Sequence, residues 1–394
     1  MSEYSRNTKL LHSKKTIDGM ALQPETVPLF ATVAFSQKNL SDVKRAYEEK
    51  QYTYVRTRSP NRRVLADAIS LLEEGEDTFV AASGMGGIFS TLFALAGAGD
   101  HILCNQAIYG ETHEIMTELL PRFQVETEMV PFRDLSEVAA HIRPNTRIIY
   151  TEVASNPCLE LSDLPELAKL AHANGACLVV DNTFTSPVNI RPLAWGADIS
   201  INSLTKFLNG HSDALGGSVT GSAELIAKIT TVGKLSGVPI TPYDSWLIFR
   251  GLQTAPLRIE KQTENAVKLA AALEKDPHVK RVDHPSLESC PQRELAQKLF
   301  GDKGGTAMLS FVVPEDEEKI DAFLERLTLS KYAMTLGGLR TTLSHPCTSS
   351  HHAVPDAERR ALGITPGLFR VSVGLETAED LIADFTQALR VFDA

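Results

Sequence analysis

The feature that most constrains the fold is a regular alternation of short apolar runs and helix-like segments between Arg62 and Pro256. Helical stretches such as LPELAKLAHAN separate the apolar runs, which read TFVAAS, HILCNQ, RIIYTEV, CLVVDN, ADISINS and GGSVTG. Strands joined by helices pair in parallel, because a helical crossover returns the chain to the same edge of the sheet. The pattern therefore predicts an α/β fold with a mostly parallel sheet covered by helices.

The segments on either side of this alternation have a different character. Residues 1–61 contain prolines and few apolar periods, and we interpret them as an extended N-terminal arm. A long helical stretch near residues 242–275 closes the large domain at 62–256. Residues 257–394 contain fewer strands, within TAMLSFVVP, KYAMTL and LFRVSVGLE, interleaved with amphipathic helices. This last part is expected to form a smaller α+β domain.

Composition excludes several classes of function. The formal charge of −10 on 394 residues argues against nucleic acid or an anionic membrane as the main partner. No segment has the length and apolarity of a membrane span or a signal peptide, so a cytoplasmic protein is expected. The five cysteines are scattered and predict neither disulfides nor a zinc site. The histidine-rich stretch SHPCTSSHH is also rich in serine, and no metal site is expected there.

Polar and small residues follow several of the apolar runs, where a parallel sheet gathers its ligands. Gly84 lies in SGMGG, directly after the first run, and small residues at a helix start let N–H groups approach a phosphate. A dinucleotide site would also need an acidic residue at the end of the next strand. That strand ends in Cys104, Asn105 and Gln106, so the dinucleotide hypothesis loses support.

Two further runs end in groups that suit pyridoxal phosphate. CLVVDN ends near Asp181, and ADISINSLTK brings Ser203, Thr205 and Lys206 to the end of the next run. This cofactor needs a lysine to bind it, a carboxylate for its pyridine nitrogen, and hydroxyl and N–H groups for its phosphate. Taken singly, such a lysine is usually a solvated charge and such an aspartate a helix cap. Their occurrence together and in this order favours a cofactor site.

At these positions the chain resembles the transsulfuration family of pyridoxal phosphate enzymes, which includes methionine and cystathionine γ-lyases, cystathionine γ-synthases and O-acylhomoserine sulfhydrylases. Matching segments span nearly the whole chain: YVRTRSPNRRVLADAISLLEEGE, SGMGGIFS, AIYGET, TEVASNP, VVDNTFTSP, NSLTKFLNGHSD, TLGGLRTTLSHP and FRVSVGLE. The resemblance implies the aspartate aminotransferase-like fold of PLP-dependent transferases. It also implies pyridoxal 5'-phosphate as the cofactor and a γ-substituted amino acid as the substrate.

The resemblance assigns expected roles to individual residues. Lys206 resembles the Schiff-base lysine, Asp181 the partner of the pyridine nitrogen, and Tyr109 a ring-stacking and catalytic tyrosine. Arg370 resembles the arginine that binds the substrate carboxylate, for which a guanidinium fork is well suited. The remaining cofactor contacts implied in this way are Gly84, Met85, Asn156, Ser203 and Thr205, together with Tyr54 and Arg56, which in the family reach the cofactor of a neighbouring subunit. A homotetramer, a dimer of dimers with shared active sites, is therefore expected.

The chain departs from the family pattern where the substrate is selected. Glu111 stands two residues after the stacking tyrosine, where methionine γ-lyases have cysteine and cystathionine γ-lyases glycine. Met334 replaces a glutamate common among members that use cystathionine, and Thr335 replaces a serine. Arg340-Thr341-Thr342 replaces the usual ESL, close to the expected distal end of the substrate. Glu111 and Met334 are therefore the residues we expect to shape specificity.

These patterns favour a γ-lyase that acts on a methionine-like or homocysteine-like amino acid, on cystathionine, or on canavanine if Glu111 binds a cationic distal group. Glu111 could equally turn toward water. The main alternative is a γ-replacement transferase of the synthase or sulfhydrylase type. A third alternative is a nucleotide-binding or catalytically silent protein, against which the set of Lys206, Asp181 and Tyr109 speaks.

Overall fold

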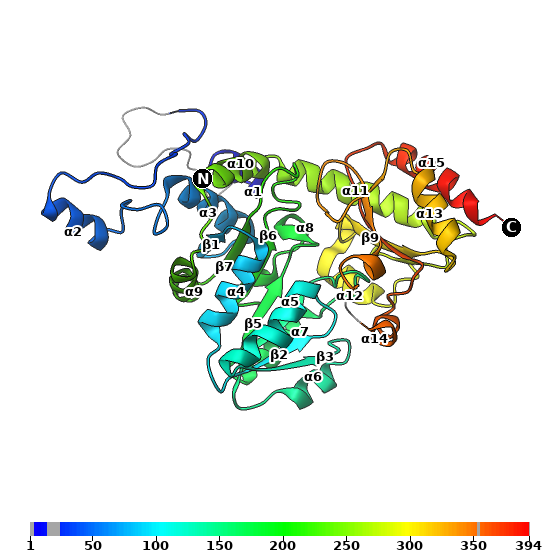
Figure 1. Ribbon diagram of the computed structural model, residues 1–394, viewed down its shortest axis with the longest axis horizontal. Coiled ribbons are helices and arrows are strands. Elements are labelled where there is room, and N and C mark those ends of the chain that lie inside the picture. Colours follow the sequence, from blue (N-terminus) through cyan, green and yellow to red (C-terminus); the bar gives the residue numbers. More distant parts are fainter. Residues whose placement is uncertain (1–3, 14–23, 353–354, 394) are drawn as a thin grey trace.

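The computed structural model describes residues 4–13, 24–352 and 355–393, and a mostly parallel sheet forms the centre of its larger half (Figure 1). In this described part the sheet has seven strands in the order β1-β7-β6-β5-β4-β2-β3. All neighbours from β6 to β3 are parallel, and β7 is antiparallel to both β1 and β6. The bounds are β1 (Asp77–Ala81), β2 (His101–Asn105), β3 (Glu126–Val130), β4 (Thr146–Glu152), β5 (Cys177–Asp181), β6 (Ile199–Ser203) and β7 (Gly217–Gly221). The expected α/β class is confirmed.

Helices cover both faces of this sheet because successive strand residues point to opposite sides. Ile199 and Ile201 of β6 pack into an apolar core with one helical layer, whereas Ser200 and Asn202 face the other layer and bond to its Glu73. The first layer contains α4 (Gly84–Leu95), α5 (Gly110–Glu114), the single-turn helices Ile115–Leu119 and Leu120–Phe123, and α9 (Ala223–Ser236). The second contains α3 (Pro60–Glu73), α7 (Leu164–Ala173) and α10 (Pro242–Leu252).

Three short helices complete the larger half. They are α6 (Leu135–His141), α8 (Ser186–Asn189) and the 3-10 turn Pro192–Trp195. The edge strand β3 has no counterpart among the apolar runs of the sequence. It reads ETEMV, begins with the exposed Glu126, and pairs only with β2 in the described structure. A strand open on one edge needs no continuous apolar run, which is why hydrophobicity alone does not reveal it.

A smaller mixed sheet forms the C-terminal half. Its strand order is β10-β11-β12-β9-β8, with bounds β8 (Arg281–Asp283), β9 (Met308–Val312), β10 (Lys331–Tyr332), β11 (Thr342–Ser344) and β12 (Leu368–Ser372). Phe311, Phe369 and Phe385 pack together in its core, with ring centroids 5.5 to 5.9 Å apart around Phe311. Its helices are α12 (Arg293–Phe300), α13 (Glu317–Arg326), α14 (Asp356–Ala361) and α15 (Ala378–Leu389), with 3-10 turns at Gly301–Lys303, Pro346–Thr348 and Arg390–Phe392.

The helix α11 (Ala255–Leu273) runs from one half to the other, as Figure 1 shows. Ile259 packs in the core of the larger half, and Leu269 in that of the smaller half. Arg258 donates hydrogen bonds to the carbonyls of Phe207 (3.0 Å), Leu208 (3.1 Å) and Gly251 (2.8 Å). Further along, Asn265 donates to the carbonyls of Gly374 (3.0 Å) and Glu376 (2.7 Å), just after β12. The helix is thus tied to both halves by buried polar groups.

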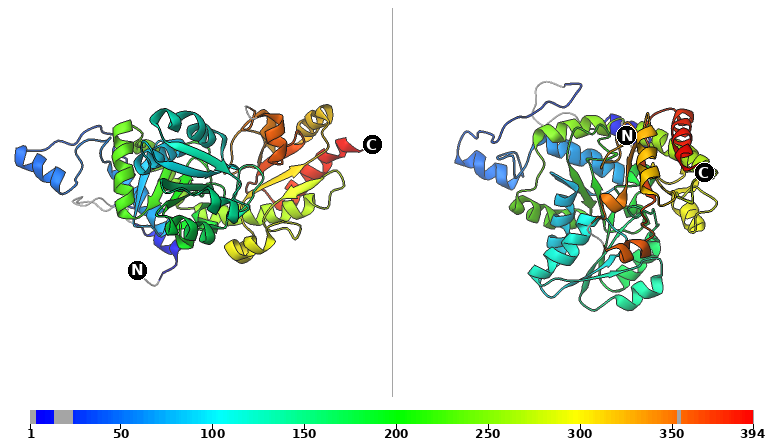
Figure 2. Two further views of the ribbon diagram at one scale, coloured as in Figure 1. Left: turned by 90° about the horizontal axis from the view of Figure 1, so that it is seen from below. Right: turned by 45° about the vertical axis from the view of Figure 1, so that its right-hand side comes forward.

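The N-terminal segment is only partly attached to this body. Helix α1 (Arg6–Leu11) packs against α3, whereas α2 (Leu40–Glu48) stands away from the rest of the chain in both views of Figure 2. Leu40 is 79% exposed and Tyr47 66% exposed. Within its described residues, the segment interpreted as an extended arm therefore contains two short helices before α3 begins, and its outer part presents apolar side chains to the surroundings.

Candidate active site

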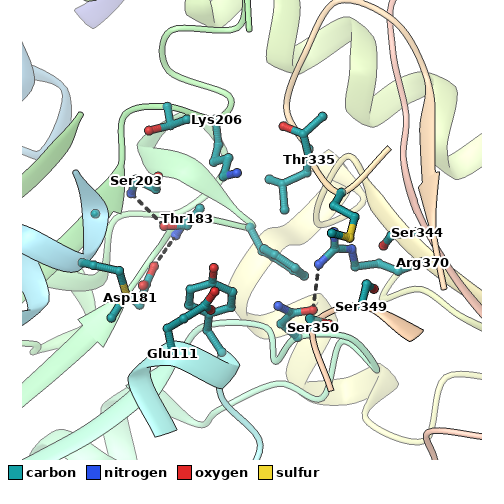
Figure 3. Close-up of a pocket in the computed structure, with 18 of the residues that line it drawn as sticks. Glu111, Asp181, Thr183, Ser203, Lys206, Thr335, Ser344, Ser349, Ser350 and Arg370 are labelled. Atoms are coloured by element: carbon teal, nitrogen blue, oxygen red, sulfur yellow. Dashed lines mark hydrogen bonds between the residues drawn. The ribbon is translucent and has the colours of Figure 1, made fainter. Parts of the chain in front are cut away.

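A cavity of about 560 Å³ lies between the two sheets (Figure 3). One side, here called the first-sheet wall, comes from strand ends and the loops after them: Gly84, Tyr109, Glu152, Asp181, Ser203 and Lys206. The other side, the second-sheet wall, comes from β11, β12 and their loops: Met334, Thr335, Ser344, Ser349, Ser350 and Arg370. Met85, Glu111, Asn156 and Thr205 also line the cavity.

The ends of β5 and β6 place Asp181 close to the turn that carries Lys206, because these strands are parallel neighbours. Thr183 connects them: its N–H donates to Asp181 Oδ1 at 2.8 Å, and its Oγ1 accepts the N–H of Ser203 at 2.8 Å. The two residues that the sequence places at consecutive strand ends therefore share one cavity. Figure 3 shows this pair of hydrogen bonds.

Lys206 is held by backbone packing and has a perturbed amine. Gly337, at φ +76°, lies so close that an added Cβ would be 2.4 Å from the backbone nitrogen of Phe207. Burial lowers the pKa of the Lys206 ammonium, and the positive charge of Arg370 lowers it further. A buried amine that more readily gives up its proton is a better nucleophile and base than a surface lysine.

The start of α4 has the features that a phosphate requires. Ser83 caps the helix by accepting the N–H of Gly86 at 3.0 Å, while the first N–H groups of a helix have no acceptor within it. A Cβ on Gly84 would lie 3.1 Å from Cβ of Ser203, so the absence of a side chain keeps this corner open. Free N–H groups and the positive end of the helix dipole together favour an anion.

Two carboxyl groups lie side by side at the floor of the cavity. Glu152 and Asp181 are register partners at the ends of β4 and β5. Burial raises the pKa of both groups, and their mutual repulsion raises that of Glu152 further. No ion pair to Asp181 occurs within the described ranges, 4–13, 24–352 and 355–393. A protonated pyridine nitrogen would supply the positive charge that this carboxylate lacks.

Glu152 is a site residue that motif reasoning missed. Its Oε1 accepts the N–H of Tyr109 at 2.8 Å, and its Oε2 accepts the N–H of Asn156 at 3.0 Å. Asn156 Oδ1 in turn accepts a hydrogen bond from Arg370 Nη1 at 3.0 Å. One carboxylate therefore fixes two loops that carry expected site residues. The signal was present, since Glu152 ends an apolar run within TEVASNP.

The substrate-facing end of the cavity combines charges of both signs. Arg370 is 6% exposed, burial lowers the pKa of its guanidinium to about 10, and it lies over the ring of Phe184 at 5.7 Å. Glu111 lies near the phenol of Tyr109, whose pKa is raised by burial and then by this carboxylate. Met334 is 70% exposed at the rim. Thr335 lines the cavity beside it.

Arg340, Thr341 and Thr342, which we expect close to the distal end of the substrate, are not among the residues that line the cavity. Thr341 is instead turned toward Glu376, to which its N–H donates at 2.7 Å and its hydroxyl at 2.8 Å. This threonine thus holds the segment after β12. The loop after β11 lines the cavity instead, through Thr348, Ser349, Ser350 and His352.

Tyr54 and Arg56 do not reach the cavity of their own chain. Tyr54 is 43% exposed, and the guanidinium of Arg56 lies 5.7 Å from its ring centroid. Arg56 Nη1 also donates to the carbonyl of Lys234 at 3.2 Å. Both residues belong to the segment next to α2, so they are placed to contact something other than this chain's own cavity.

Comparison with known proteins identifies the family. The model of the Cys/Met metabolism PLP-dependent enzyme family matches residues 7–390. This chain belongs to that family. It is 39% identical to L-methionine gamma-lyase of Fusobacterium nucleatum subsp. polymorphum, over 98% of each chain. Among solved structures, cystathionine gamma-lyase from Lactobacillus plantarum, complexed with L-serine, has a TM-score of 0.91 and 32% identity over 99% of this chain and 100% of that one.

Cystathionine gamma synthase from Xanthomonas oryzae pv. oryzae, in complex with aminoacrylate and cysteine, is equally similar, with a TM-score of 0.91 and 31% identity over 98% of each chain. The protein is therefore a PLP-dependent enzyme of the transsulfuration type with the fold of that family, and pyridoxal phosphate is its cofactor. In the part of the chain that the structure describes, no helix is long and apolar enough to cross a membrane.

Proposed function

We propose that the protein is a γ-lyase that removes the γ-substituent of an amino acid, with Lys206 as its cofactor-binding and proton-transferring residue. The observation that carries the proposal is the shared cavity of a buried amine, a strand-end carboxylate and a buried arginine, at Lys206, Asp181 and Arg370. Pyridoxal phosphate, when bound, supplies an electron sink for the charge left on the substrate carbon. Gly84, Met85, Ser203 and Thr205 would hold its phosphate.

Individual side chains would bind the substrate and transfer its protons. Arg370, oriented by Asn156, binds the α-carboxylate and so fixes which bonds face the cofactor. The amine of Lys206 takes the α-proton, for which its lowered pKa prepares it. Tyr109 lines the same cavity beside Glu111, and its hydroxyl would transfer a proton to or from the departing γ-group. Its raised pKa keeps the hydroxyl protonated, as a proton donor must be.

The choice of substrate is proposed to depend on Glu111. Its carboxylate lies near Tyr109 and Lys206 on the cavity side of α5, where Figure 3 shows it. Its negative charge helps to raise the pKa of Tyr109 and partly opposes the lowering of the pKa of Lys206. Met334 offers no carboxylate at the rim. An amino acid with a cationic distal group, such as canavanine, would pair with Glu111 bidentately. A methionine-like substrate is the alternative if Glu111 faces solvent.

A γ-replacement transferase is the second candidate function, because the similar structures include a cystathionine gamma synthase. Both reactions remove protons from the α- and β-carbons and then release the γ-group, and they differ in whether a nucleophile takes its place. Without an incoming nucleophile, and after hydrolysis by water, the products are the released γ-group, a 2-oxo acid and ammonia. Measuring both products across methionine, homocysteine, cystathionine, O-acylhomoserine and canavanine, with and without thiols, separates the two functions. Turnover that requires a thiol would replace the γ-lyase proposal with the transferase.

The role of Glu111 has a direct test. In Glu111→Gln, kcat/KM for canavanine should fall by well over tenfold, since loss of one partner of a desolvated ion pair costs about 2–5 kcal/mol. The value for methionine should change little. Glu114→Gln, on the same helix but outside the cavity, is the matched control. Equal losses for both substrates, or no turnover of canavanine by the parent enzyme, would remove Glu111 from substrate recognition.

We also propose that the active form is a dimer of dimers in which Tyr54 and Arg56 complete the site of a neighbouring subunit. Two observations support this arrangement. Both residues lie outside the cavity of their own chain, and the segment that carries them ends in exposed apolar side chains on α2. A second copy of the chain would cover this surface and bring a positive charge to the phosphate end of its partner's cavity.

A further inference from the structure

The second-sheet wall contains a buried hydroxyl group without a hydrogen-bond partner in the described structure. Ser344, the last residue of β11, is 2% exposed and lines the cavity, and its Oγ is unpaired. It lies directly opposite Arg370 in the antiparallel register of β11 and β12. Side chains directly opposite each other lie on the same face of a sheet with Cβ atoms about 5 Å apart. Figure 3 shows the two residues side by side.

Neighbouring polar groups do not account for this hydroxyl. His345 is already engaged at both ring nitrogens, with Thr348 Oγ1 at 3.0 Å and the carbonyl of Pro366 at 2.6 Å. Ser349 donates to the carbonyl of His345 at 2.7 Å, and the hydroxyl of Ser350 bonds to His351 Nδ1 at 2.9 Å. Of Ser344, Ser349 and Ser350, it is Ser344, beside Arg370, whose hydroxyl has no hydrogen-bond partner in the described structure.

A buried hydroxyl that makes no hydrogen bond is costly. Other buried hydroxyls, such as that of Ser330, are also unpaired in the described structure, but Ser344 differs from them in lining the cavity, where a ligand can supply the missing partner. A carboxylate would satisfy it, because a carboxylate has two oxygens that accept and none that donates. Arg370 uses Nη1 to bond Asn156, which leaves other N–H groups of the guanidinium for a ligand. The combination of an arginine fork and an adjacent O–H is suited to one carboxylate.

We propose that Ser344 is a substrate-binding residue whose hydroxyl donates a hydrogen bond to the α-carboxylate of the amino-acid substrate, alongside Arg370. This inference rests on the proposed function, in which the substrate carboxylate enters this end of the cavity. Ser344 therefore acts on substrate binding and orientation, and takes no part in proton transfer.

The test measures binding to the PLP-loaded enzyme by calorimetry, with two probes that each keep one half of a methionine-like substrate. The first, 4-(methylthio)butanoate, has the carboxylate but no amine and cannot react at the cofactor. The second, 3-(methylthio)propylamine, has the amine but no carboxylate. In Ser344→Ala the carboxylate should bind about tenfold more weakly, as expected for loss of a hydrogen bond to a charged group, and the amine should bind as before.

Two further variants distinguish a specific loss of carboxylate binding from a general effect on folding. Ser330→Ala removes another buried, unpaired hydroxyl, but outside the cavity, and should leave both affinities unchanged. Ser344→Cys keeps the size of the side chain with a weaker donor and should give an intermediate loss. Unchanged carboxylate affinity in Ser344→Ala, or equal losses for both probes, would overturn the inference.

The outcome can be separated from that of the proposed function. Selective loss of carboxylate binding in Ser344→Ala would support the role of Ser344 even if the parent enzyme released no 2-oxo acid, in which case γ-elimination alone would fail. Conversely, γ-elimination by the parent enzyme with unchanged carboxylate binding in Ser344→Ala would leave the reaction standing and remove Ser344 from substrate binding.

Discussion

The two walls of the cavity are built on different principles. The first-sheet wall consists of residues at the ends of parallel strands, whose side chains converge because the strands end at one edge. The second-sheet wall consists of short antiparallel strands and the loops after them. Buried carboxyl groups support the first wall: Glu152 holds two of its loops, and Glu73 bonds to β6 from behind. In the second wall, strand register alone places Ser344 beside Arg370.

The difference between the walls separates the chemistry of the cofactor from selection of the substrate. A wall made of strand ends can move little without breaking the sheet, so it suits a cofactor whose position must be fixed. A wall made of loops tolerates replacement, and Met334 and Thr335, which we expect to contact the substrate, lie there. Changes to the cofactor-holding residues of the first wall should therefore abolish the reaction, whereas changes to Met334 and Thr335 in the loops of the second wall, or to Glu111 on α5, should alter substrate preference.

The largest effect is expected from Lys206→Ala. Loss of the amine removes both the covalent attachment of the cofactor and the base, so activity should fall more than about a thousandfold. The yellow colour that depends on this attachment should disappear, and borohydride should fix the cofactor onto Lys206 only in the parent enzyme. Lys228→Ala, on the exposed side of α9, is the control. Trapping of another lysine would contradict the assignment.

A smaller but still large effect is expected from Glu152→Gln. An amide has one oxygen, so the N–H of either Tyr109 or Asn156 loses its acceptor, at a cost of about 1–3 kcal/mol. We expect kcat/KM to fall roughly ten- to a hundredfold and the melting temperature to drop. Glu160→Gln, in the same loop but bonded to the exposed Arg133, should do neither. Parent-like kinetics in Glu152→Gln would show that the loops need no such support.

Mixing variants tests whether the first wall is completed by another subunit. Arg56→Ala and Lys206→Ala should each be inactive alone. After joint re-assembly half of the dimers are hybrids, and each hybrid has one of its two sites intact, so about a quarter of the parent activity should return. Recovery of none would show that the sites are not shared between subunits.

The last prediction concerns stability and its pH dependence, and no effect on the reaction is expected. Glu73 is buried behind β6, and burial raises the pKa of its carboxyl from 4.5 to about 7. The unfolded chain therefore releases this proton at lower pH than the folded one, and the contribution to stability is full below pH 4.5 and lost as pH rises through 7. The loss should be roughly 3 kcal/mol. Urea midpoints of Glu73→Gln should lack this slope, and an equal slope in both proteins would refute it.

Much of the first-sheet wall could be predicted because its site residues directly follow the strands in the sequence. Each apolar run marks a strand, and the next residues mark the ligand edge, which is why the sequence pointed to Asp181 and Lys206. The role of Glu152 was not predicted, because its hydrogen-bond partners are backbone N–H groups, which no sequence motif indicates. Ser344 and Arg370 became neighbours only through the register of β11 and β12, which the sequence does not specify. The direction of the Thr341 side chain could not be predicted either: this residue is near Thr335 in sequence, but its hydroxyl donates to Glu376.

Helix α11 sets the distance between the two walls of the cavity. Arg258 donates hydrogen bonds to the carbonyls of the two residues that follow Lys206. Asn265 donates to two carbonyls that follow β12, the strand that carries Arg370. At 1.5 Å per residue these two anchors are about 10 Å apart, and a hydrogen-bonded helix neither stretches nor shortens appreciably. The number of residues between Arg258 and Asn265 on α11 therefore sets the distance between the Lys206 amine and the Arg370 guanidinium. A single residue inserted between them would change both this distance and the rotation of one wall relative to the other.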